Sequence, residues 1–109
     1  MTLGAQALNV TDDGVVNDTL TVTSGYVELS SVGVDAGTPN VVLSETGALE
    51  GDLLVVARVD AVAGDVTINE VDGVTEMAGA ATLNTAEFDT VTFIYTGTTW
   101  VELARSNNG

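Results

Sequence analysis

Apolar and polar residues alternate along several short stretches of this chain. In residues 90–95, every second side chain is Val91, Phe93 or Tyr95, and the positions between them are mostly threonine. An extended strand places such alternate residues on one face, so a period of two is typical of a half-buried β-strand. Weaker runs of the same kind occupy residues 19–23, 26–29, 41–43, 53–59, 66–69 and 99–103. No window of eleven residues carries an apolar stripe at helical spacing, so the pattern predicts an all-β protein.

Turn-forming residues separate these runs at intervals of about eight to twelve positions. They include Asp13-Gly14, Ser24-Gly25, Gly51-Asp52, Asp72-Gly73 and Gly97. Short strands with regular turns are typical of a sandwich or barrel, so we expect two antiparallel sheets packed face to face. The alternation predicts a core made of Leu20, Val22, Val27, Leu29, Val42, Leu54, Val56, Ile68, Leu83, Val91, Phe93 and Val101.

The length of 109 residues suits one hydrophobic core and one domain. Residues 1–18 contain few apolar side chains, which favours an N-terminal arm rather than part of the core. Residues 19–109 are then expected to form a single β-sandwich domain.

The run from Leu53 to Val59 departs from strict alternation, because both faces of its first five residues are apolar. An antiparallel strand with one wet face should alternate. We therefore expect one face to meet the core and the other a second subunit, in a closed homotrimer. The competing interpretation is that residues 1–18 cover this face in a monomer. The predicted subunit interface comprises Leu53, Leu54, Val55, Val56, Ala57, Arg58 and Trp100, with Trp100 filling either the core or the interface.

The charge is strongly negative: 16 acidic residues face two arginines, with no lysine or histidine, giving a net charge of −14. Binding to nucleic acids or to anionic membranes needs clustered cations, so both partners are excluded. Self-repulsion of this size destabilises a compact chain, and concentrated salt screens it. The composition therefore favours a protein built for high salt, the alternative being an ordinary acidic surface that maintains solubility.

The side chains offer little chemistry. Without cysteine, histidine or lysine there is no nucleophile–base pair and no Schiff-base residue, so we expect no enzyme and no cofactor. Calcium prefers carboxylate and carbonyl oxygens, which makes Asp12, Asp13 and Asp72 weak candidate ligands. Their spacing does not continue into an EF-hand, and Asp-Gly turns explain the same residues.

Residues 41–108 resemble a small β-domain found in structural proteins of tailed viruses. The matching features are Gly51-Asp52 leading into an apolar strand, the short strand 66–69, and a closing hairpin with Gly97-Thr98-Thr99-Trp100 followed by Arg105-Ser106-Asn107. Such domains occur in head-decoration, head-fibre and tail-fibre proteins. The resemblance implies a jelly-roll-like sandwich, a homotrimer and no catalytic residues.

The resemblance and the charge together lead to a functional hypothesis. We expect a capsid decoration or turret subunit that binds the major capsid protein on the outer, extracellular surface of a virion. The lysine-free composition points to a marine or haloarchaeal host. The alternative is a carbohydrate-binding tip domain of a tail fibre or cell-surface protein.

Overall fold

The computed structural model describes residues 2–10, 18–31, 39–60, 65–84 and 88–108, and within them the chain is all-β. This confirms the predicted fold class. No helix in these segments has the length and apolarity that crossing a membrane requires. The strands are β1 (Thr2–Val10), β2 (Asp18–Thr21), β3 (Ser24–Ser31), β4 (Asn40–Ser44), β5 (Leu53–Arg58), β6 (Val66–Ile68), β7 (Thr75–Glu76), β8 (Ala81–Leu83), β9 (Thr90–Tyr95) and β10 (Trp100–Ser106).

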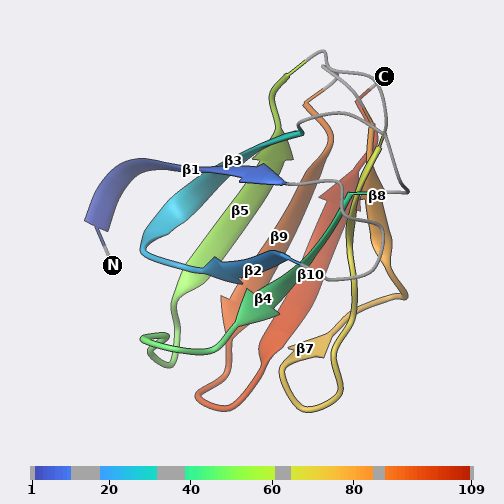
Figure 1. The fold of residues 1–109 in the computed structure, drawn as a ribbon. Coiled ribbons are helices and arrows are strands. Elements are labelled where there is room, and N and C mark those ends of the chain that lie inside the picture. Colours follow the sequence, from blue (N-terminus) through green and yellow to red (C-terminus); the bar gives the residue numbers. More distant parts are fainter. Residues whose placement is uncertain (1, 11–17, 32–38, 61–64, 85–87, 109) are drawn as a thin grey trace.

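The first six strands form parallel coils. β1, β3 and β5 are adjacent and parallel in a six-stranded sheet, while β2, β4 and β6 are adjacent and parallel in a four-stranded sheet. The chain thus passes from one sheet to the other at each step, and each coil stacks on the previous one (Figure 1). This is the arrangement of a short β-solenoid.

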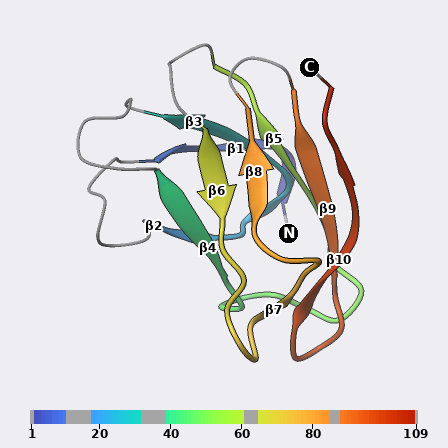
Figure 2. The same ribbon diagram turned by 90° about the vertical axis from the view of Figure 1, so that its right-hand side faces the viewer.

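The C-terminal strands pair in the opposite sense. β8 is antiparallel to β6, β9 is antiparallel to β5, and β10 forms a hairpin with β9 (Figure 2). The hairpin turn closes with a hydrogen bond from Thr96 N to Thr99 O of 3.0 Å, and Gly97 within it has φ +102°. The short β7 adds to the other side of β10 in parallel.

The sequence predicted two antiparallel sheets in a jelly-roll-like sandwich. That architecture is wrong, because β1–β6 pair in parallel. Both sheets are mixed, because the N-terminal strands are parallel and antiparallel pairs occur among β5, β6 and β8–β10. The physical reason is that alternation and turn spacing determine which face a side chain occupies. They do not determine the direction of the neighbouring strand, which depends on whether the chain returns in the same sheet or crosses to the other.

The core lies between the two sheets, and ten of the twelve expected core residues are buried in it. Val42 and Val101 are the exceptions, since each is only partly buried. In β4 the inward residues are Val41 and Leu43, and Val42 shares the outward face with Asn40 and Ser44, so the predicted parity was off by one residue. In β10 the inward residue is Trp100, which pairs across the hairpin with the buried Tyr95.

The N-terminal segment joins the sheet where the sequence indicated an arm. β1 pairs with β3 over most of its length, and Val10 at its end is fully buried. Five of the nine residues of β1 are apolar, but they occupy odd and even positions alike, so they did not indicate a strand. Residues 11–17 lie outside the described part of the chain.

Candidate functional site

The outward face of the six-stranded sheet carries mainly apolar side chains. One row across five strands consists of Ala5, Tyr26, Val55, Thr92 and Ala104, as the register of the pairs shows. These side chains point away from the core, because their neighbours Val27, Leu54, Val56 and Val91 line it. A second row consists of Leu53, Ile94 and Val101. We call these eight residues the outer patch.

Exposure and charge set the outer patch apart from the rest of the surface. Leu53 is 54% exposed, and Val55, Ile94 and Val101 are partly exposed. On this face of the paired strands the carboxylates are Glu28 on β3 and Glu76 on β7, which pairs with Val101 at the edge of the outer patch, in a chain with 16 acidic residues. The Tyr26 hydroxyl donates a hydrogen bond of 3.2 Å to Glu28. Burial, followed by the charge of Glu28, raises the pKa of Tyr26, so the tyrosine stays neutral.

The outer patch contains only part of the interface predicted from sequence. Leu53 and Val55 belong to it, whereas Leu54 and Val56 are fully buried inside the subunit. Ala57 shares the outward direction of Val55 and is nevertheless 2% exposed. Contacts with a second copy through β5 are therefore left to Leu53 and Val55.

Arg58 lies inside the subunit rather than at a rim. Its side chain is fully buried and forms an ion pair with Asp60. Its Nη1 donates to the carbonyl oxygen of Leu83 at 3.4 Å, which links the end of β5 to β8. Asp60 also accepts a hydrogen bond of 3.2 Å from Ser31 N, so the pair connects three strands at one end of the core.

Trp100 is also a core residue. It is fully buried, and its ring packs edge-on against Tyr95 with centroids 5.0 Å apart. The indole Nε1 donates to the carbonyl oxygen of Ser44 at 3.1 Å. Trp100 therefore ties the C-terminal hairpin to the end of β4, and it offers no exposed platform for a ligand.

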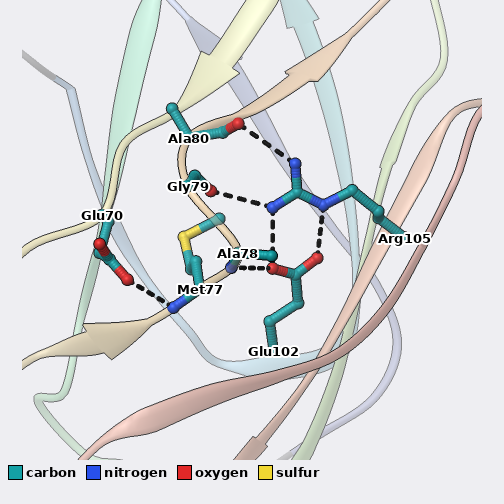
Figure 3. A network of polar contacts seen from close by, with 7 residues as sticks. All are labelled: Glu70, Met77, Ala78, Gly79, Ala80, Glu102 and Arg105. Atoms are coloured by element: carbon teal, nitrogen blue, oxygen red, sulfur yellow. Dashed lines mark hydrogen bonds and ion pairs between the residues drawn. The ribbon is translucent and has the colours of Figure 1, made fainter.

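A shallow hollow of about 520 Å³ lies between β7 and β10, and a polar network borders it (Figure 3). The guanidinium of Arg105 donates from Nε and Nη2 to the carboxylate of Glu102, at 2.6 and 2.8 Å. It also donates to the carbonyl oxygens of Gly79 and Ala80, at 2.9 and 3.2 Å. Glu102 in turn accepts from the amide of Ala78 at 2.8 Å.

This network is better suited to holding the β7–β8 connection than to binding a ligand. The hydrogen bond from Arg105 lowers the pKa of Glu102, so the pair remains ionised at neutral pH. Four donor interactions of Arg105 are already used within the chain, and an incoming anion would also meet the Glu102 carboxylate. Sequence reasoning missed this pair, because residues three apart on a regular strand face opposite sides, and the bulge between Glu102 and Ala104 is not visible in the sequence.

Of the three candidate calcium ligands, only Asp72 lies in the part of the chain that the structure describes. Asp72 lies in a turn closed by a hydrogen bond of 3.0 Å from Val74 N to Val71 O, followed by Gly73 at φ +78°. This is the Asp-Gly turn that the sequence offered as the alternative. Asp12 and Asp13 fall outside the described residues. Across the segments that the structure describes, no three acidic residues come together as a metal site.

A smaller hollow of about 220 Å³ lies where β8 faces β9 and β10. Its floor includes the buried Asp89, whose two carboxylate oxygens accept from Asn84 N and Asn108 N at 2.9 and 2.8 Å. These bonds fasten the end of β10 to the start of β9. No aromatic side chain lines either hollow, although ligand pockets commonly use them.

Comparison with known proteins adds no relative: no protein-family model matches the chain, and no curated protein matches it. The resemblance to virion domains thus rests on the motifs quoted above.

Proposed function

We propose that this protein is a structural subunit of a virion, a decoration or turret protein that adheres to the capsid surface as a homotrimer. The observation that supports this best is the outer patch, an apolar sheet face on a chain with a net charge of −14. An exposed apolar area with charges kept outside it is characteristic of a protein–protein contact.

A trimer places three copies of the outer patch around one axis and closes without leaving a free contact. Burying Leu53, Val55 and Ile94 in each subunit contributes several kcal/mol to association, at about 1.5–3 kcal/mol per side chain. The patch suits self-association because a second copy presents the same apolar side chains. Tyr26 holds Glu28, and Glu76 lies beside Val101 at the edge of the patch, so both carboxylates stay outside the eight patch residues.

The carbohydrate-binding alternative has less support. Sugars commonly stack on exposed aromatic rings, and the one tryptophan of the chain, Trp100, is fully buried. The virion proposal needs no ligand pocket, and it agrees with the shallow, internally bonded hollows.

The assembly is tested by light scattering in 2 M NaCl, where screening shortens the reach of charge repulsion to about 2–3 Å. We expect a mass that is a multiple of three copies of the 11.1 kDa chain. Val55→Asp should remove the three-fold assembly, because it places a charge in the centre of the outer patch. A particle that stays at three copies after this substitution would refute the interface.

The matched control is Val42→Asp. Val42 is also a partly buried valine in a central strand, but it lies on the outward face of the four-stranded sheet. It should lower stability to a similar extent and leave the mass unchanged. The location on a virion is tested separately, by measuring copies of this chain per major capsid protein in purified particles. Hundreds of copies per particle are expected, and a few would favour a tail tip.

A further inference from the structure

The stack of parallel coils is closed at one end and open at the other. At the C-terminal end, the antiparallel β9 and β8 cover β5 and β6 and stop the coil pattern. At the N-terminal end, β1 and β2 are the outermost strands of their sheets in the described part of the chain. Figure 1 shows both strands on the same side of the molecule. We call the free side of β1 and β2 the open end.

β1 lacks the features that normally protect an edge strand. Proteins block such edges with charged residues, proline or very short strands, because unpaired backbone groups recruit other strands. β1 has nine residues and contains neither proline nor a charged side chain. Its one irregularity, between Thr2 and Ala5, lies at its start, and the pairing from Ala5 to Val10 is regular.

The core also reaches the open end. Gln6 and Leu8 share the inward face with Val27 and Leu29, their partners on β3. Leu8 packs on the core and remains partly exposed. The Gln6 side chain donates to Thr21 O at 2.7 Å and accepts from Thr23 N at 2.8 Å, so it bridges the two sheets there. A further layer of strands would complete the burial of Leu8.

We propose that the open end binds the open end of a second copy of this chain, with β1 paired antiparallel to its symmetry mate. Both copies carry a net charge of −14, so their contact depends on salt screening and on an edge strand that brings no further charge into the contact. β1 itself meets that requirement. The antiparallel end of a second copy does not, because its edge strands β7 and β8 have only two and three residues. Head-to-head pairing about a two-fold axis therefore gives a dimer and no fibre.

The facing of side chains limits the register. Two paired residues point to the same face of a sheet, so each even-numbered, inward residue of β1 must pair with an even-numbered residue of the copy, and each odd-numbered residue with an odd-numbered one. The regular segment 5–10 then pairs about Ala7 or about Leu8. In the first register Ala7 lies opposite its own copy. In the second register Ala7 lies opposite Asn9 of the other copy. The two Ala7 residues are then diagonal neighbours, about 7–8 Å apart.

The test introduces one cysteine into a chain that has none, so any disulfide or crosslink must join two copies. Ala7→Cys is combined with Val55→Asp, which removes the three-fold contact and keeps this test independent of the proposed function. The control is Thr82→Cys in the same background, since Thr82 is exposed on the edge strand β8. The probe is a short bis-maleimide, applied to folded protein at micromolar concentration in 2 M NaCl.

We expect Ala7→Cys to form covalent dimers at least ten times faster than Thr82→Cys, and Val55→Asp without cysteine to have the mass of two copies. Equal crosslinking rates, or a one-copy mass for Val55→Asp, would overturn the open-end dimer. A second variant, Ala7→Lys in the Val55→Asp background, tests the same edge without cysteine. Like charges meeting across the two-fold axis should halve the mass, while the circular dichroism spectrum stays that of a β-protein.

Discussion

The parallel coils and the antiparallel C-terminal strands solve the same burial problem in different ways. In the coils, β1–β6 return to the same sheet only after crossing the core, so each strand relies on the coil before it. In the C-terminal region, β9 and β10 form a hairpin with a four-residue turn and need no crossing. The coils therefore end in an exposed edge, whereas the hairpin region is a closing unit.

The two regions also differ in how their polar groups are used. At the C-terminal side, Asp89 and the Glu102–Arg105 pair fasten connections by several hydrogen bonds each. In β1, the side chain of Gln6 joins the two sheets through its hydrogen bonds with Thr21 and Thr23. The strands of the closed end are thus held by hydrogen bonds within one chain, whereas β1 at the open end has a free edge to which we propose that a second copy binds. The following substitutions test how far the closed end stabilises the coils.

Trp100→Ala should have the largest effect, because it removes the fully buried side chain that joins the hairpin to β4. We expect a loss of about 3–5 kcal/mol in the free energy of unfolding, from lost burial and the cavity left behind. Chemical denaturation of Trp100→Ala in a background that carries both Val55→Asp and Ala7→Lys isolates the subunit from the two proposed contacts. A loss of less than about 1 kcal/mol in the free energy of unfolding would show that the hairpin does not stabilise the coils.

Arg58→Met should follow, since it leaves the carboxylate of Asp60 without its buried cation at the junction of β5 and β8. We expect a loss of about 2–4 kcal/mol, because breaking a buried pair leaves one charge uncompensated. The double variant Arg58→Met with Asp60→Asn should recover part of that loss. If the double variant is as unstable as the single one, the ion pair is not the cause.

The sequence predicted the faces of the strands better than their neighbours. In β9 and β3 the alternation identified Val91, Phe93, Val27 and Leu29 as core, because one face of each strand is clearly more apolar. In the short run 41–43 all three residues are apolar, and the prediction chose the wrong parity with Val42; in β5, where both faces are apolar, the predicted core residues Leu54 and Val56 are buried. Parallel stacking depends on contacts between residues about 20–30 positions apart, which local patterns do not encode.

Of the interface residues predicted from the sequence, some lie on the surface and others lie in the core. The doubly apolar run 53–57 drew attention to β5, and the side chains of this run that reach the surface are Leu53 and Val55. We predicted Arg58 to lie at the subunit interface because it stands near the end of the strand. The sequence does not show that the side chain of Asp60 forms an ion pair with Arg58 inside the subunit. The outer patch as a whole combines residues from five strands, so only the sheet order brings it into view.

Glu102→Gln should have the smallest effect, and its dependence on pH identifies it. The folded chain lowers the pKa of Glu102 through the hydrogen bond from Arg105. A lowered pKa stabilises the fold above the unfolded value, near pH 4.5, and the benefit is lost as pH falls through the lower folded value. At pH 7 we expect a cost of about 0.5–1 kcal/mol, kept small because the Arg105 side chain is 37% exposed.

Melting temperatures of wild type and Glu102→Gln, measured between pH 7 and pH 3, check this expectation. Acid also reduces the overall repulsion of the chain, so the difference between the two proteins carries the signal. That difference should shrink below about pH 4.5 and vanish when the glutamate is protonated in both the folded and unfolded chain. Glu76→Gln, on the neighbouring β7 and exposed, removes the same charge and serves as the control. If both variants show the same pH profile, the Glu102–Arg105 pair adds nothing to the closed end beyond its net charge.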